Sequence, residues 1–319
     1  MLKTENDYQE VSVKTQEIAE DSIDPNELIL AILQKKILIV IITSLFTLGA
    51  ALFAINSPNI YKSEALLAPA DTDKSGGGLG ALAGQLGGLA SMAGISLGDD
   101  GDENVKMAIE VIKSRQFISE FIQRHKILPD LMAVDSWNMA DNTLSYDEDD
   151  YLVSESQWVR DVNLPFKAEP SMQEAYKEFN KIMSVALAKD SGMVTISIEH
   201  VSPYIAKNWV TWLVEDINAE MKSRDVLEAK RSTEFLNKQI SETTIAGIRT
   251  ILFKLIEEQA KTILFAEVRD EYIFKTIDKA IVPEEKFKPK RLLICILGAV
   301  LGFALSVMFV LMQYFSKKS

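Results

Sequence analysis

The residue types that most often carry out chemistry are few in this 319-residue chain, or lack the spacing that chemistry needs. The chain has two histidines, His125 and His200, and neither has a second His or Cys within a helical turn, so neither fits a metal site. We expect both to be ordinary surface or partly buried side chains. A phosphate-binding loop ending in Gly-Lys-Ser/Thr is also missing. The sequence therefore predicts no catalytic residue, no cofactor and no bound metal.

Two acidic runs are the remaining candidates for a cation site. One contains Asp99, Asp100, Asp102 and Glu103, and the other occupies 147–150. Neither has the alternating Asp/Asn positions, fixed glycine and distant glutamate of a calcium loop, so we interpret both as solvated acidic loops. The formal net charge of −12, with no basic stripe, excludes nucleic acid as a partner.

Two long uncharged runs, 37–55 and 292–313, frame the chain. Each is long enough to cross about 30 Å of hydrocarbon as a helix. Lys35 and Lys36 precede the first run, while Lys62 alone lies close behind it, which predicts a cytoplasmic N-terminus. Two spans place both termini on one side of the membrane. We therefore expect both termini in the cytoplasm and the middle section on the other side.

The fold class that we predict is an α+β membrane protein, in which two transmembrane helices flank a periplasmic α/β base with a long protruding helix or helical hairpin. The predicted parts are a cytoplasmic tail at 1–33, a transmembrane helix at 34–56, a periplasmic domain at 57–290 containing a Gly-rich loop at 76–98 and a long helical region at 203–270, a second transmembrane helix at 291–314, and a cytoplasmic tail at 315–319.

The Gly-rich loop is an uncharged stretch of mostly Gly, Ala and Leu. One interpretation is a mobile apolar loop that touches the bilayer or lines a gap between subunits, and the other is a flexible linker. Its glycines cost too much in a helix for a third span. The glycines that define it are Gly76, Gly80, Gly84, Gly88 and Gly94.

The first half of the middle section is predicted to begin with a strand at 61–69. A helix follows at 102–125, which Asp102 is placed to cap. We interpret 129–164 as irregular, with short helices. Ser171 and Glu174 then form a capping-box pattern that predicts the start of another helix.

The second half begins with a predicted β-hairpin, in which 185–188 and 194–198 flank Asp190-Ser191-Gly192. Ser202-Pro203 then starts a stretch of helical pattern that, unbroken, would reach about 95 Å. Because the chain must return to the membrane, we predict a turn near 243–247, and then a last strand at 272–281 that pairs with the hairpin or the first strand.

The second span carries a small-residue row, Gly298, Gly302 and Ser306, that predicts close helix packing. The row either contacts another subunit or faces lipid, in which case its spacing arose by chance. The membrane-proximal segment before this span contains Pro283, Pro289, Lys290 and Arg291.

The layout resembles the Wzz-type chain-length determinants, the class 1 polysaccharide co-polymerases of Gram-negative bacteria. The matching residues, in order between and beside the two spans, are 23–28 before Lys35-Lys36, 61–65 just outside the first span, Leu128-Pro129 and Trp137, Val201-Ser202-Pro203, Val282-Pro283 and 288–291. The proline-rich stretch keeps only Pro283 and Pro289, and the Gly-rich insert is longer than the family's pattern.

The resemblance implies a homo-oligomeric ring in the bacterial inner membrane with long helices in the periplasm. It implies a non-catalytic scaffold that regulates the modal chain length of a surface polysaccharide, foremost lipopolysaccharide O-antigen, with a Wzy-type polymerase. Its other expected contacts are membrane lipid and the growing polysaccharide.

Three other functions are open to the sequence. The first is a two-span component of capsule or exopolysaccharide export that works with a separate tyrosine kinase, because this chain has neither the kinase phosphate loop nor a tyrosine cluster. The second is a periplasmic sensor, which would need a cytoplasmic signalling domain where we expect only short tails. The third is a membrane-tethered glycan enzyme acting through the run at 147–150.

Overall fold

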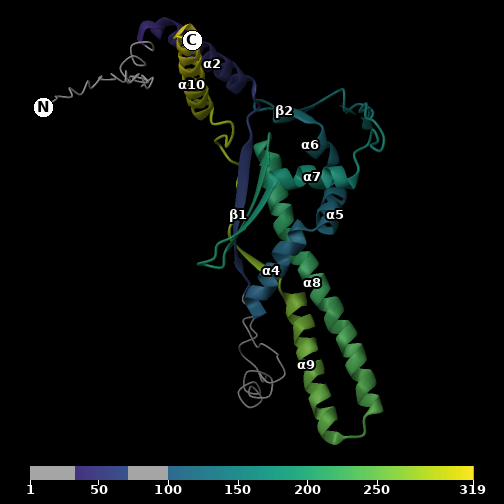
Figure 1. The fold of residues 1–319 in the computed structure, drawn as a ribbon. Helices are drawn as coiled ribbons and strands as arrows, with labels where there is room; N and C mark the ends of the chain where they lie inside the picture. The colour runs from purple at the N-terminus through teal and green to yellow at the C-terminus, as the bar shows by residue number, and fades with distance from the viewer. Residues whose placement is uncertain (1–32, 71–99, 319) are drawn as a thin grey trace, which may run out of the picture. The chain divides into compact units, whose positions relative to one another are not determined.

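The computed structural model describes residues 33–70 and 100–318. They form two compact units: the first contains the helices at the two ends of the chain, and the second runs from Pro58 to Pro289 (Figure 1). The second unit combines a four-stranded sheet with helices. The predicted fold class, an α+β chain with an apolar helix near each end, is confirmed.

The first unit consists of α2 (Lys36–Asn56) and α10 (Arg291–Lys318), which pack against each other. Both helices are long and apolar enough to cross a membrane. Most of their apolar side chains are exposed, as expected where lipid replaces water as the solvent.

The sheet of the second unit is antiparallel with the strand order β6-β7-β1-β8. Its strands are β1 (Tyr61–Pro69), β6 (Met183–Leu187), β7 (Val194–His200) and β8 (Phe274–Asp278). The predicted hairpin is confirmed as β6 and β7, with Gly192 at φ 67° in the turn, where a side chain would be strained. The predicted last strand pairs with β1 rather than with the hairpin.

Two helices, α4 (Asp100–Lys113) and α5 (Arg115–His125), occupy the segment where we predicted one. Ser114 is extended (ψ 148°), and its Oγ accepts a hydrogen bond from the backbone N–H of Phe117 at 3.2 Å. The helical spacing of apolar residues continues through this break, which is why the sequence pattern did not reveal it. Asp102 lies inside α4 and is not its N-cap.

The segment predicted to be irregular with short helices instead contains one short helix and two small hairpins. These elements are α6 (Leu128–Met132), β2 (Val134–Asn138), β3 (Thr143–Tyr146), β4 (Tyr151–Leu152) and β5 (Gln157–Trp158). Asn142 and Ser156 adopt positive φ in the two turns. Strands this short give too little alternation for the sequence to predict them.

Three further helices complete the second unit: α7 (Met172–Ile182), α8 (Pro203–Glu242) and α9 (Ala246–Val268). The predicted capping box of α7 is confirmed, and Ser202 caps α8 by accepting from Ile205 N–H. The predicted turn is confirmed at 243–245, where Thr243 and Ile245 are extended. Gly247 lies within α9 and is not part of the turn.

The core of the second unit lies between one face of the sheet and α4, α5, α7 and the first half of α8. Alternate residues of β1 and β7 are buried on this face, and Trp209, Leu213 and Ile217 of α8 are buried in the same core. The second half of α8 runs with α9 beyond the sheet as a helical hairpin (Figure 1).

Candidate functional site

His125, at the end of α5, joins α5 to α8. Its Nε2 lies 3.0 Å from Oδ2 of Asp216, which also accepts from the Arg124 guanidinium at 2.8 Å. The imidazole stacks on Trp212 with ring centroids 4.5 Å apart. These contacts fix the end of α5 to the long helix, so the partly buried side chain predicted from the sequence has a packing role.

His200, at the end of β7, is more buried than we predicted, with 7% of its surface exposed. Its Nε2 donates to the Asp130 carbonyl and its Nδ1 accepts from Ser202 N–H, both at 3.0 Å. A neutral imidazole provides one donor and one acceptor, as these two contacts require. Burial lowers the pKa of His200, which favours this neutral form.

The acidic run 147–150 forms a turn between two small hairpins. The carboxylate of Asp147 accepts from Asp149 N–H at 3.0 Å, and its carbonyl accepts from the N–H groups of Asp150 and Tyr151. Asp147, Glu148 and Asp149 are exposed. In 33–70 and 100–318 no three His, Cys, Asp or Glu side chains are placed to hold a metal ion.

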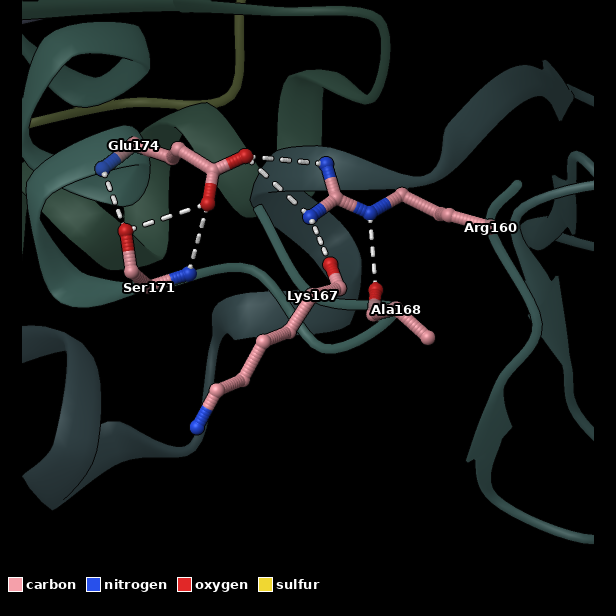
Figure 2. Close-up of polar contacts among 5 residues, drawn as sticks. All are labelled: Arg160, Lys167, Ala168, Ser171 and Glu174. Atoms are coloured by element: carbon pink, nitrogen blue, oxygen red, sulfur yellow. Dashed lines mark hydrogen bonds and ion pairs between the residues drawn. The ribbon is translucent and has the colours of Figure 1, made fainter. Parts of the chain in front are cut away.

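A dense polar cluster of the second unit is built around Arg160 (Figure 2). Its guanidinium donates to Glu174 Oε1 through both terminal nitrogens, at 3.1 and 3.2 Å. It also donates to the carbonyl oxygens of Ala168 through Nε at 2.8 Å and of Lys167 at 2.9 Å. A planar guanidinium that satisfies a carboxylate and two carbonyls at once fixes the backbone between them.

Glu174 links this cluster to the start of α7. Its Oε2 accepts from the N–H and the Oγ of Ser171, both at 3.0 Å, which closes the capping box (Figure 2). Partial burial opposes ionisation of Glu174, but the hydrogen bonds from Ser171 and Arg160 outweigh it and hold the pKa of the carboxyl below its usual value. The two anchors, Arg160 and the α7 N-terminus, close the loop 161–167, so we call this cluster the Arg160 clamp.

Sequence reasoning found half of the Arg160 clamp. The Ser-x-x-Glu pattern identifies Ser171 and Glu174 as a capping box, but nothing in it indicates that the carboxylate also binds an arginine fourteen positions upstream. The residues between Arg160 and Ser171 form no helix or strand. No periodicity therefore links the two ends of the loop.

The membrane-proximal segment of the second unit meets the start of β1. Lys288 pairs with Ile60 through the backbone, and its side chain forms an ion pair with Glu199. The ammonium groups of Lys62 and Lys288 lie 5.5 and 5.4 Å from the centroid of the Phe287 ring. These contacts bring together the points at which the chain enters and leaves the second unit.

Pro283 and Pro289 lie in the connection between β8 and α10. Lys290 is exposed, and Arg291 begins α10. The Nε of Arg291 donates to the carbonyl of Ala54 in the last turn of α2, at 3.1 Å. A cation at that position interacts favourably with a helix C-terminus, so Arg291 joins the ends of the two membrane helices.

The small-residue row of α10 faces α2 of the same chain. A Cβ atom at Gly298 would lie 2.4 Å from the Cβ of Ala50, and one at Gly302 would lie 2.7 Å from the Cβ of Phe46. Ser306 is buried and donates to the Phe303 carbonyl. Close approach of the two helices therefore needs glycine at both positions. A contact of this row with another subunit stays a prediction.

The Gly-rich loop lies outside the described residues, and so do Gly76, Gly80, Gly84, Gly88 and Gly94. Its sequence also contains a G-x-S-x-G match at 94–98. Such a motif supplies a nucleophile when it forms a strand-to-helix elbow and a histidine reaches the serine. On its own the match is a weak indication of catalysis, and His125 and His200 make the packing contacts described above.

Comparisons with known proteins place two parts of the chain. Residues 21–125 match the Wzz family model, described as chain length determinant protein, and 267–315 match a model described as G-rich domain on putative tyrosine kinase. The first match runs from before α2 to the end of α5, and the second from the end of α9 into α10. No curated protein matches the chain.

Among solved structures, the chain is similar to a full-length bacterial polysaccharide co-polymerase at 13% identity, over 92% of this chain and 99% of that chain, with a TM-score of 0.37. It is also similar to a fragment of WzzB, a polysaccharide co-polymerase from Salmonella Typhimurium, at 12% identity, over 72% of this chain and 100% of that chain, with a TM-score of 0.25.

Proposed function

We propose that the chain is a Wzz-type chain length determinant that regulates the modal length of lipopolysaccharide O-antigen as a non-catalytic, oligomeric scaffold acting with a Wzy-type polymerase. The observation that carries the proposal is the Wzz match over 21–125, which spans the first membrane helix, the first strand of the sheet and two core helices. Regulation of polysaccharide chain length is the activity of that family.

We place the protein in the bacterial inner membrane with two spans, both termini in the cytoplasm and 57–290 in the periplasm. Two apolar helices near the ends of the chain support this topology, as does the excess of lysine before the first span. Alkaline phosphatase fused at Gly192, in the β6–β7 turn, is expected to be active. If only fusions at the two termini are active, the orientation of the protein is the reverse of the one proposed.

Self-association is the second part of the proposal, and α9 supports it. One row of apolar residues on α9 is buried or half-buried along α8: Leu252, Ile256, Ile263 and Ala266. Two further sets remain exposed on the flanks: Ile248, Ile251 and Leu255, and Phe253, Leu264 and Val268. A helix that is apolar on nearly all sides is stable in water when other surfaces cover it. Hairpins of neighbouring copies would provide that cover on both flanks.

A non-catalytic role agrees with the contacts of the groups most often used in catalysis. His125 and His200 hold elements together, and the carboxylate of Asp147 accepts from its own turn. The scaffold would therefore act on the polymerase by contact. The length of the polymer would depend on how long the polymerase stays bound to the growing polysaccharide. This protein would form no covalent bond in the process.

The test of the function is a deletion strain examined by lipopolysaccharide gel. We expect the polymer to be made but its modal band cluster to be lost, and we expect plasmid-borne wild-type protein to restore the cluster. An unchanged ladder would refute the proposal. Complete loss of polymer would indicate a catalytic or transport role.

A second candidate function is favoured by the match of 267–315 to the G-rich domain on putative tyrosine kinase. Under this alternative the chain is a two-span component of capsule or exopolysaccharide export that works with a separate tyrosine kinase. The same deletion strain distinguishes the two functions, because export failure removes surface capsule or secreted polymer and leaves the O-antigen ladder unchanged.

A further inference from the structure

The loop 161–167 combines rigid ends with exposed apolar side chains. Val162, Leu164 and Phe166 alternate along it, and Leu164 is 93% exposed, a very high value for a leucine. The Arg160 clamp fixes the end of the loop through the carbonyl groups of Lys167 and Ala168 (Figure 2). An additional bond from Phe166 N–H to the Asn163 carbonyl, at 3.1 Å, closes a turn at its tip.

These ends limit the loop to a shape in which its apolar side chains do not fold back onto the core. Three apolar groups held in water by an ion pair and several hydrogen bonds are unfavourable for a subunit alone. Pre-organisation of this kind reduces the entropy lost when a loop meets a partner surface. The loop is therefore built as a contact surface, and the question is which surface it meets.

The position of the loop in the second unit favours the bilayer. Under the two-span topology given under Proposed function, residues 57–60 are all that separates the end of the first span from β1, so the chain connection keeps the start of β1 within a few residues of the bilayer. The segment between β2 and α7, which contains the loop, lies at the end of the unit where β1 starts and opposite the tip of the α8–α9 hairpin (Figure 1). In agreement, Trp137 of β2 packs edge-on against Tyr61, with ring centroids 5.6 Å apart.

The composition around the loop agrees with this position. Tyr151 packs against Trp158 and Tyr146 just before the loop, with ring centroids 4.9 and 5.9 Å apart. Tyr and Trp are the residues enriched where a membrane meets water. Met139 and Val153, in the turns of the neighbouring hairpins, are also exposed apolar residues. Asp161 and Lys167 within the loop carry opposite charges, whereas the nearby turn 147–150 is acidic, so a zwitterionic bilayer is the appropriate surface for a test.

We propose that the loop 161–167 inserts Leu164 and Phe166 into the periplasmic leaflet of the membrane that the two spans cross, as a third anchor point of the subunit. The proposal rests on the two-span topology given under Proposed function. It does not depend on which polysaccharide the protein regulates.

The test uses the full chain in phosphatidylcholine nanodiscs. Cys295 is the sole cysteine of the sequence, so a Cys295→Ala background allows one fluorescent label at a time. Leu164→Cys and Phe166→Cys carry the bimane label in the loop, and Ser191→Cys, exposed in the β6–β7 turn, carries it as a control. Lipids with a spin label on the acyl chain quench a probe in the bilayer, and iodide quenches a probe in water.

We expect the labels at 164 and 166 to be blue-shifted relative to the label at 191, quenched by the spin-labelled lipid and protected from iodide. Equal iodide quenching at 164 and 191 would overturn the proposal in favour of a solvated loop. Protection from both quenchers would overturn it in favour of a contact with another protein or another copy. The lipopolysaccharide gel of the deletion strain does not depend on where the loop lies. Failure of this proposal and failure of the proposed function are therefore distinguishable.

Discussion

The two halves of α8 belong to one continuous helix but lie in different surroundings. In the first half, Trp209, Leu213 and Ile217 are at most 1% exposed in the core beneath the sheet. In the second half, Leu227 is 50% and Phe235 62% exposed, and the partner helix α9 exposes Ile251 to 60%. Both halves contain apolar side chains, so the difference for these residues lies in what covers them. The base carries its own core, whereas the hairpin leaves these apolar side chains exposed within the subunit.

The largest effect is expected in the base, from Trp209→Ala. Trp209 is among the largest fully buried side chains of the described residues and packs on Phe179 and His200, with ring centroids 5.8 and 5.1 Å away. Removing a buried aromatic side chain lowers the free energy of unfolding by about 3–5 kcal/mol. Urea unfolding of the detergent-solubilised chain, followed by far-UV circular dichroism, measures this loss.

The matched control for the base is Leu227→Ala, on the same helix but in the hairpin. Because Leu227 is half-exposed, we expect a loss of roughly 0.5 kcal/mol or less in the isolated subunit. Equal losses for the two variants would mean that the two halves of α8 do not differ as described.

A smaller effect is expected where the hairpin returns to the base. Asn218 is buried on α8, and its Oδ1 accepts from the N–H groups of Ile273 and Phe274 at 2.8 and 2.9 Å. Asn218→Ala leaves both buried donors unpaired, which costs about 2–3 kcal/mol in the free energy of unfolding. The control is Asn208→Ala, an exposed asparagine on the same helix. If both variants unfold at the same urea concentration, this anchor does not stabilise the return of the chain.

The base should also respond to acid, through His200. Burial lowers its pKa in the folded state, so the unfolded chain binds the proton more readily. The stabilisation from the neutral imidazole is therefore complete above the unfolded pKa of about 6.5 and is lost as the pH falls below that value. Melting temperatures between about pH 7.5 and pH 5.5 test this, with His200→Gln as the comparison, because glutamine has a donor and an acceptor but does not titrate in this range. A slope that is unchanged in the variant would assign the pH response to other groups.

The sequence predicts most of the base and the course of the hairpin, because their signals are local. The caps at Ser171 and Ser202, the Asp190-Ser191-Gly192 turn and the apolar row through Trp209 each depend on neighbours within a few residues. On α9 the apolar residues at helical spacing do not share one environment: Leu252 and Ile263 are half-buried, but Ile248, Leu255 and Leu264 are exposed. Apolar residues lie on nearly all sides of α9, so periodicity alone does not identify which side faces α8.

The candidate sites were predicted less completely, because their contacts join residues far apart in the sequence. Glycine spacing identifies Gly298 and Gly302 as close-packing positions, but not that α2 of the same chain is the neighbour. The sequence around Arg160 does not indicate its role, because a single arginine in an irregular segment has the same pattern as a solvated surface charge. In both cases the sequence does not identify the residues that these side chains contact.

The smallest effect on folding, and the sharpest test of the comparison, is expected from Ile251→Glu on α9. Ile251 is exposed in the subunit, so the substitution should change its free energy of unfolding by roughly 0.5 kcal/mol or less. If neighbouring copies cover this flank, a buried and unpaired carboxylate would instead break up the assembly. We expect light scattering in detergent to show a fall from a large oligomer to smaller species, and the modal cluster of the polysaccharide ladder to be lost. Lys254→Glu, an exposed position on the same helix, controls for the added negative charge. An intact oligomer in the Ile251 variant would mean that this flank of the hairpin is exposed for a reason other than self-association. The core of the base would then be sufficient to stabilise the hairpin.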